Sequence, residues 1–214
     1  MRITRMSWLL TALATAAVAV PGADAAGGPR SPELHALGAP LEPVEEARLD
    51  LVLEEKAAAS PAPPELRTFA TQVARRAVRV SCPSDAEWRW HLNLVGRVLG
   101  YAWSGRTIVA WLAPNACRGA RAVSRGNTKY SERKRAMGVL VLVHEALHLR
   151  SWRHADDEAA VECAAIRRFK RSVIQLGGTQ EEAQRLWPWA LALHWWLVRR
   201  HDEYWRRSCP VLWY

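Results

Sequence analysis

The apolar runs of this chain are short, and cysteine is absent from its N-terminal third. A helix that crosses a bilayer needs about 20 consecutive apolar residues, which neither residues 6–20 nor residues 186–198 supply. The first cysteine is Cys82, so no early cysteine is present that could carry a lipid anchor. These absences argue against a permanent attachment to a membrane.

The N-terminal segment has the features of an export signal. Arg2 and Arg5 precede the apolar residues 6–20, and Ala23-Asp24-Ala25 follows with the small-x-small pattern of a cleavage site. We expect residues 1–25 to be a signal peptide that is removed after Ala25. The mature protein is therefore expected to be secreted or otherwise extracytoplasmic.

The four cysteines include no C-x-x-C pair, which argues against a zinc ion held by cysteine. An even number of cysteines in an exported chain predicts two disulfides instead. Three pairings are possible among Cys82, Cys117, Cys163 and Cys209. We favour Cys82 with Cys117 and Cys163 with Cys209, because each pair would join neighbouring segments.

Acidic residues are outnumbered in this chain, with 21 against 30 basic residues. Loss of Arg2, Arg5 and Asp24 with the signal peptide would leave a formal charge of +8. This charge is compatible with an anionic membrane or cell-wall surface as a partner, but solubility alone also explains it. Nucleic acid is not expected as a partner, because the chain is predicted to be exported and carries no nucleic-acid-binding motif.

The composition divides the mature chain into an arm and a domain. Residues 26–39 are rich in Gly, Pro and Ala and are expected to be flexible. A helix is predicted over residues 43–59, and a Pro-rich linker follows it. Residues 26–64 are therefore expected to form a flexible N-terminal arm with one helix, and residues 65–214 to form one domain.

We expect an α+β fold that is mostly helical, with no internal repeat. Hydrophobic spacing and Ser/Thr-x-x-Glu capping boxes predict helices that begin near residues 65, 84, 131, 156 and 179. Pro188 is expected to kink or split the last of them. Strands are predicted near residues 77–82 and 106–112, forming a small sheet. Residues 100–105 are expected to form a turn, and residues 118–129 a basic loop.

The most informative feature is the pentad His144-Glu145-Ala146-Leu147-His148, an H-E-x-x-H pattern directly after the apolar run 137–143. On a helix, residues i and i+4 share a face, so His144 and His148 can bind one metal ion. Glu145 is placed to act as general base toward a water on that metal. The alternative is a pair of helix histidines with ordinary hydrogen bonds. The apolar helix around the pentad favours the metal site.

Two candidates for a third ligand follow the pentad closely. A catalytic zinc site usually has three protein ligands, and His154 has the spacing of the third histidine in the metzincin motif. That resemblance is incomplete, because Ser151 replaces the glycine of the motif. The only three methionines, Met1, Met6 and Met137, all precede the pentad, so the Met-turn of that class is absent.

The stretch Asp157-Glu158-Ala159-Ala160-Val161-Glu162 resembles the second zinc-binding helix of gluzincin-type metallopeptidases. The resemblance implies Glu158 as the third ligand. It also implies Glu162 as an acceptor for a ligand N–H, that of His144. With Leu149 after the pentad and Cys163 after Glu162, the chain further resembles compact exported actinobacterial proteins of this type. The alternative is an acidic helix start favoured by the helix dipole.

The resemblance implies a zinc-dependent metallopeptidase that hydrolyses peptide bonds. One Zn²⁺ would be held by His144, His148 and Glu158, with Glu145 as general base for a zinc-activated water. The sheet would pack on the pentad helix and the ligand helix after it. A peptide or protein substrate would pair with an edge strand, for which residues 107–112 are the candidate.

Roles are also expected for other polar and aromatic residues. Tyr130, Arg150 and His201 are candidates for stabilising the oxyanion, whereas His91 and His194 are expected to make ordinary hydrogen bonds. The tryptophans of the last helix are expected to pack against the pentad helix. Two alternative functions are a non-catalytic zinc-stabilised cell-envelope protein and a basic Trp-rich module that binds membranes or the cell wall.

Overall fold

The structure is a computed structural model that describes residues 43–95, 98–104, 107–150 and 157–200, with residues 204 and 209. The predicted signal peptide lies outside these residues, as do residues 26–42, Ser151, His154 and His201. None of the helices that the structure describes is both long and apolar enough to cross a membrane.

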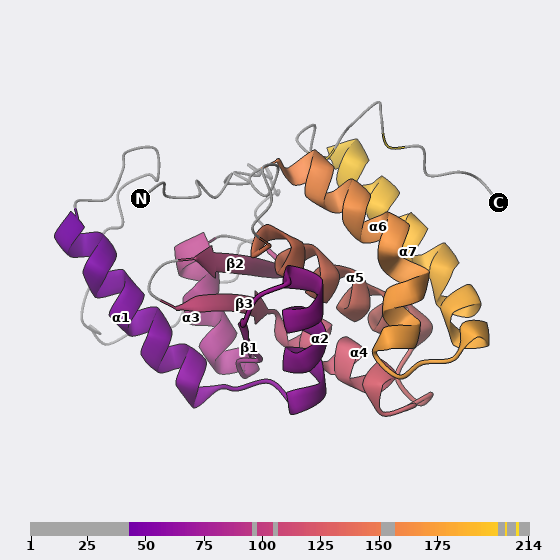
Figure 1. Ribbon diagram of the computed structural model, residues 1–214, viewed down its shortest axis with the longest axis horizontal. Helices are drawn as coiled ribbons and strands as arrows, with labels where there is room; N and C mark the ends of the chain where they lie inside the picture. The colour runs from indigo at the N-terminus through magenta and orange to yellow at the C-terminus, as the bar shows by residue number, and fades with distance from the viewer. Residues whose placement is uncertain are drawn as a thin grey trace, which may run out of the picture.

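The expectation of a mostly helical α+β fold is confirmed (Figure 1). In chain order the elements are α1 Pro43–Ala59, α2 Pro64–Ala74, β1 Arg79–Ser81, α3 Asp85–Val95, β2 Gly100–Ser104, β3 Ile108–Leu112, α4 Pro114–Ser124, α5 Glu132–His148, α6 Glu158–Gln175 and α7 Gln180–Arg200. The helix predicted over residues 43–59 has those bounds, and both predicted strands are present.

The sheet has the strand order β1-β3-β2, with β1 parallel and β2 antiparallel to β3. Residues 100–105 were expected to form a turn, but Gly100–Ser104 form β2. Glycine at residues 100 and 105 suggested a turn, whereas pairing with β3 and packing of the intervening aromatic residues favour a strand. Tyr101 pairs directly with Trp111, and their rings stack with centroids 5.9 Å apart.

The basic loop expected at residues 118–129 is also a correction, because most of it belongs to α4. Pro114 occupies the first turn of this helix, where a missing N–H costs nothing. Gly119 does not interrupt α4, since it lies where the helix crosses α5. A Cβ at Gly119 would collide with the backbone of Lys134, and one at Gly138 would collide with the backbone of Ala120. The two helices therefore approach each other closely through glycine.

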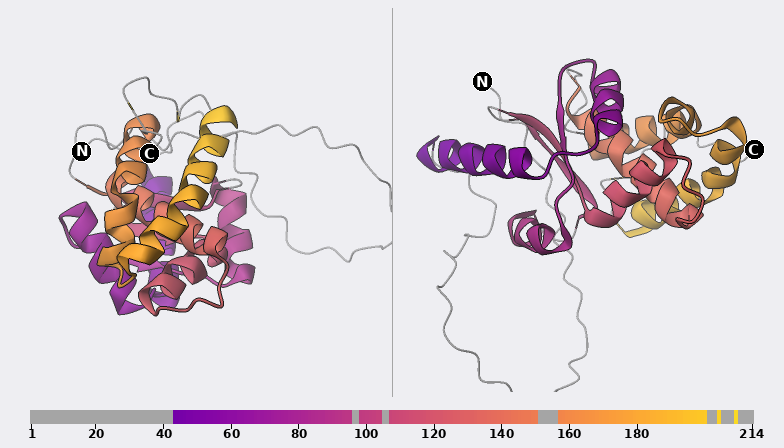
Figure 2. Two further views of the ribbon diagram at one scale, coloured as in Figure 1. Left: turned by 90° about the vertical axis from the view of Figure 1, so that its right-hand side faces the viewer. Right: turned by 90° about the horizontal axis from the view of Figure 1, so that it is seen from below.

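Helices cover both faces of the sheet (Figure 2). On one face, the indole N–H of Trp103 donates to Asp50 of α1 at 2.6 Å, and His91 of α3 packs against Trp111. On the other face lies α5, because a Cβ at Gly100 of β2 would meet the side chains of Val141 and Glu145. The pentad helix α5 therefore packs directly against this second face of the sheet.

The described part of the N-terminal arm is packed rather than loose. Leu53 and Ala57 of α1 are buried. The linker after α1 lies along the outer edge of β1, where Ala62 donates its N–H to Val80 at 2.9 Å and Cys82 donates to Ser60 at 2.9 Å. These bonds form because β1 would otherwise expose an unpaired edge.

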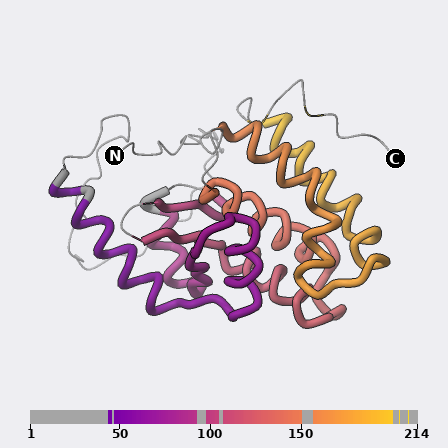
Figure 3. The backbone as a smooth tube through the Cα atoms, viewed as in Figure 1, coloured from indigo at the N-terminus to yellow at the C-terminus, as the bar shows by residue number. Residues whose placement is uncertain are grey.

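Helices α5, α6 and α7 form a bundle beside the sheet (Figure 3). Glu182 of α7 pairs with Arg135 in the first half of α5, and both residues are buried. Helix α7 continues through Pro188 without being split. The residues that α7 buries are Glu182, Ala183, Leu186, Ala190 and His194. Trp187 is half-buried and packs against the core beside Phe169, whereas Trp189 and Trp196 are exposed, so tryptophan fills this interface only in part.

Both favoured disulfide pairings are confirmed. Cys82 bonds to Cys117 and joins the end of β1 to α4, and Cys163 bonds to Cys209 and joins α6 to the chain beyond α7. No free cysteine remains, since these four are all the cysteines of the chain.

Candidate metal centre

The end of α5 and the start of α6 bring the pentad and the two glutamates together. His144 and His148 are one turn apart at the end of α5, and Glu158 and Glu162 are one turn apart at the start of α6. Asp157 caps α6 by accepting a hydrogen bond from the Ala160 N–H at 2.9 Å. Because the cap fixes the first turn, it also fixes the direction in which Glu158 leaves the helix.

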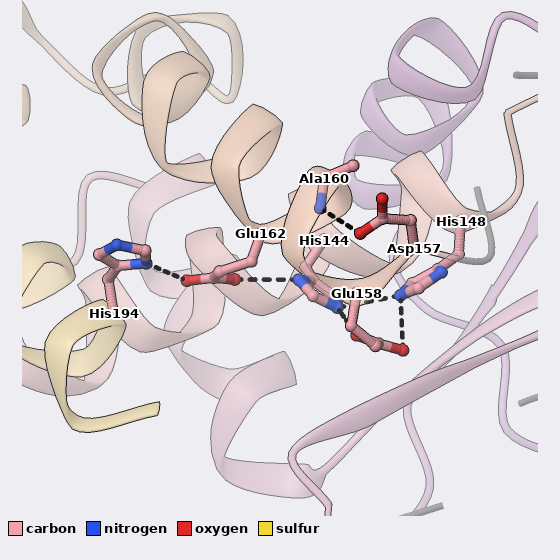
Figure 4. Close-up of polar contacts among 7 residues, drawn as sticks. All are labelled: His144, His148, Asp157, Glu158, Ala160, Glu162 and His194. Atoms are coloured by element: carbon pink, nitrogen blue, oxygen red, sulfur yellow. Dashed lines mark hydrogen bonds and ion pairs between the residues drawn. The ribbon is translucent and has the colours of Figure 1, made fainter. Parts of the chain in front are cut away.

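Three side chains converge on one point (Figure 4). The Nε2 atoms of His144 and His148 are 3.0 Å apart. The Glu158 carboxylate lies 3.1 Å from Nε2 of His144 and 3.4 Å from Nε2 of His148. The structure therefore brings together all three residues predicted as ligands.

This donor set fits a zinc ion. Zn–N and Zn–O bonds of about 2.0–2.1 Å in a tetrahedron place ligand atoms about 3.3 Å apart, which is close to the distances among His144, His148 and Glu158. Nε2 of His144 contacts both the Glu158 carboxylate and Nε2 of His148, and a single N–H on this nitrogen cannot point at both partners. A single cation between the three groups would satisfy all of them.

Behind His144, its second ring nitrogen is held by Glu162. Nδ1 of His144 lies 3.0 Å from this carboxylate, which is 1 % exposed. The other oxygen of Glu162 lies 2.9 Å from Nδ1 of His194. The implied role of Glu162 as the acceptor behind His144 has the geometry it needs, while the contact with His194 was not expected from the sequence.

The histidines around Glu158 and Glu162 lower the pKa values of these two carboxyl groups. Burial opposes ionisation of Glu158 and Glu162, but hydrogen bonds from the histidines outweigh it. The pKa of Glu158 lies well below its usual range, and that of Glu162 is lowered to about 2. Burial likewise lowers the pKa of His144, and hydrogen bonds to Glu158 and Glu162 reverse this and raise it well above 6.5. Without a metal, the carboxylates around His144 therefore favour a proton on its imidazole.

Glu145 lies beside the donor set and hydrogen-bonds to none of its members. It is 6 % exposed, and burial raises its pKa to about 7, although the nearby His144 and His148 act in the opposite direction. Its neighbour on the sheet is Gly100, where a Cβ would lie 3.0 Å from Cγ of Glu145. The carboxylate that was predicted as general base is therefore covered by the first residue of β2.

The candidate edge strand is a correction. Residues 107–112 were expected to bind substrate, but Ile108–Leu112 form the central strand β3, with both edges paired. The outer strand next to α5 is β2. The sequence suggested a turn there, and only the three-dimensional pairing shows which strand lies on the edge.

Of the three residues predicted to stabilise the oxyanion, Tyr130 lies far from this centre. Tyr130 precedes α5, whose first residue is about 18 Å along the helix from His144. Arg150 acts electrostatically on Arg168 of α6, whose pKa is lowered by burial and after it by the charge of Arg150. His201 is outside the described residues. Tyr204 was not predicted from the sequence, and its ring centroid lies 6.0 Å from that of His144.

In comparisons with known proteins, no family model, no curated protein and no solved structure matches the chain.

Proposed function

We propose that this protein is an extracytoplasmic zinc-dependent metallopeptidase that hydrolyses peptide bonds in a peptide or protein substrate. The observation that supports this most strongly is the convergence of His144, His148 and Glu158 beside a buried carboxylate that binds none of them, Glu145. Two disulfides support an oxidising, extracytoplasmic compartment.

Zinc would be held by His144, His148 and Glu158, and when bound it would polarise a carbonyl group and lower the pKa of a water molecule. Glu145 would accept the proton of the attacking water and pass it to the leaving amine. A pKa near 7 suits a group that must both take and give a proton. Burial is the main cause of the raised pKa of Glu145. The donor set makes no hydrogen bond to this carboxylate that would hold it in one orientation.

Strand β2 is suited to hold an extended substrate. Leu99 accepts a hydrogen bond from Ala113 at 2.9 Å, and the antiparallel register then directs the backbone of Tyr101 and Trp103 toward β3. The backbone groups of the alternate residues Gly100 and Ala102 point away from β3, along the outer edge of the sheet. A peptide that pairs with these groups would pass next to Glu145.

The main rival is a zinc ion that only stabilises the fold. A site of that kind requires no general base. Burial of the Glu145 carboxylate without a hydrogen bond from the described residues destabilises the fold, which a purely structural site does not explain. A conservative substitution at Glu145 distinguishes the two: it should abolish hydrolysis if the protein is a peptidase, and it should have no catalytic effect if zinc only stabilises the fold.

Glu145→Gln tests the proposal. The exported wild-type protein should cleave members of a quenched-fluorescence peptide library, and a chelator should abolish this. Glu145→Gln should keep its zinc and lose at least about 100-fold in kcat/KM, since the general base is gone. Glu181→Gln, an exposed carboxylate at the start of α7, is the matched control and should leave activity unchanged. Full activity of Glu145→Gln would exclude Glu145 as the base.

A further inference from the structure

The hydrogen-bond chain behind the metal centre does not end at Glu162. His194 is 3 % exposed and comes from α7, 32 residues from Glu162 along the chain. Its Nδ1 lies 2.9 Å from Oε1 of Glu162, while Oε2 of the same carboxylate lies 3.0 Å from Nδ1 of His144. Figure 4 shows the three side chains in one row from α7 through α6 to α5.

The carboxylate of Glu162, at the middle of this row, determines which ring nitrogen of His144 and of His194 carries a proton. An ionised carboxylate only accepts hydrogen bonds, so both rings must donate Nδ1–H to Glu162. His144 then presents Nε2 with its lone pair toward His148 and Glu158, as a metal ligand must. Both oxygens of Glu162 are needed, because an unpaired oxygen this deeply buried would be costly and would leave the carboxylate free to rotate.

His194 is itself firmly placed. It continues the buried stripe of α7 formed by Ala183, Leu186 and Ala190, which packs along the bundle. At the other end of the stripe, Glu182 pairs with Arg135 of α5. The packing of α7 against the bundle therefore holds the backbone of His194 in place relative to His144.

We propose that His194 is a positioning residue for the metal ligand His144 and acts through Glu162. It holds the carboxylate in the one rotamer that orients the His144 ring, and it thereby makes metal affinity depend on α7, a helix that supplies no ligand. This inference rests on the zinc site of the proposed function.

Zinc affinity is the readout, measured by competition with a chromogenic chelator on the full disulfide-bonded protein. His194→Ala should weaken zinc binding by about 10- to 100-fold, as the loss of an outer-shell partner does. His194→Asn should recover much of that loss, because its amide N–H lies where Nδ1–H lies. His194→Gln places its donor one atom farther out and should recover less.

A double-mutant cycle shows whether His194 acts through Glu162. Once Glu162→Ala has removed the acceptor, adding His194→Ala should change the zinc Kd little, so the two effects should not add. Additive losses would overturn the inference. Leu186→Ala, on the same buried stripe, is the control for loosened packing of α7: it should lower Tm and leave the zinc Kd unchanged.

The possible outcomes separate the two proposals. A wild-type protein that binds no zinc would refute the proposed function and this inference with it. Tight zinc binding by the wild type, His194→Ala and His194→Gln alike would preserve the zinc site and overturn the role of His194. Equal losses in Leu186→Ala and His194→Ala would overturn it as well. If His194→Ala does not fold, a tighter site in His194→Asn than in His194→Gln supports the role, and equal affinities contradict it.

Discussion

The two ends of α5 each hold a buried polar cluster, and the clusters are satisfied in different ways. Toward its start, Arg135 pairs with Glu182, one cation with one carboxylate. At its end, two imidazoles face the carboxylate of Glu158 and converge on a single point. The closed ion pair balances its own charge, although Nε of Arg135 has no hydrogen-bond partner in the described part of the chain. The convergent side chains at the other end form a group that could hold a metal ion.

The buried histidines His91 and His144 differ in the groups that surround them. His91 is 1 % exposed and hydrogen-bonds Tyr101 at 2.7 Å within a shell of tryptophans. Burial lowers its pKa to about 4, so it is a neutral core residue. His144 is similarly buried but lies among carboxylates. Burial alone therefore does not identify a functional histidine, and the groups that face each ring nitrogen do.

Breaking the closed pair should have the largest effect on stability. Arg135→Ala leaves the Glu182 carboxylate buried and unpaired, and it should lower the free energy of unfolding by about 3–5 kcal/mol. The zinc Kd of the folded protein should remain near the wild-type value. Urea unfolding and chelator competition measure the two quantities. Arg185→Ala, which breaks the exposed pair with Glu181, should cost less than about 1 kcal/mol. A large change in zinc Kd in Arg135→Ala would contradict this separation.

The cluster of His144, Glu145, Glu158 and Glu162 at the end of α5 should give the metal-free protein an optimum of stability at mildly acidic pH. The lowered pKa values of Glu158 and Glu162 contribute stability that is present above 4.5 and lost as pH falls. The raised pKa of His144 contributes stability that is present below 6.5 and lost as pH rises, and Glu145 adds a loss between 4.5 and about 7.

The Tm of the chelated protein should therefore be highest near pH 4.5. It should fall below that pH as Glu158 and Glu162 are protonated, and above it first as Glu145 ionises and then, beyond 6.5, as His144 loses its proton. Glu145→Gln should flatten the fall on the alkaline side, because it removes one of the groups responsible. A Tm that climbs steadily through neutral pH would show that the cluster does not titrate in this way.

A smaller effect is expected where β2 covers Glu145. In Gly100→Ala the new Cβ would lie 2.8 Å from Cγ1 of Val141, 2.9 Å from the Trp111 carbonyl and 3.0 Å from Cγ of Glu145. Overpacking of this kind costs about 1–3 kcal/mol, and here it should displace the base and reduce kcat/KM about 10-fold while zinc is retained. Gly119→Ala, which overpacks the α4–α5 crossing, should lower Tm without changing kcat/KM. Equal activity losses in both variants would indicate a general loss of packing.

The residues of the candidate metal centre were predicted from sequence, the two histidines from local helix geometry and the two glutamates from the resemblance of residues 157–162 to a known zinc-binding helix. His144 and His148, like Glu158 and Glu162, are one helical turn apart, and this spacing alone places each pair on one face. The pairing of Cys163 with Cys209 was also predicted, since it joins segments that flank the last helix.

The partners that the sequence did not reveal come from distant segments. Strand β2 exists because Tyr101 and Trp111 pair across the sheet, and the glycines beside it suggested a turn. His194 contacts Glu162 only because α7 packs along α6. One signal for His194 was present: it falls at the spacing of the apolar positions Ala183, Leu186 and Ala190, where a buried histidine needs a partner.

The zinc content of the purified wild-type protein and of its Glu158→Ala and His154→Ala variants tests the central claim most directly. We predict one zinc ion per chain in the wild type, its loss in Glu158→Ala, and its retention in His154→Ala. Elemental analysis after extensive dialysis against metal-free buffer measures this. A folded wild-type protein that holds no metal after loading would contradict the account, as would a Glu158→Ala variant that keeps its zinc while His154→Ala releases it.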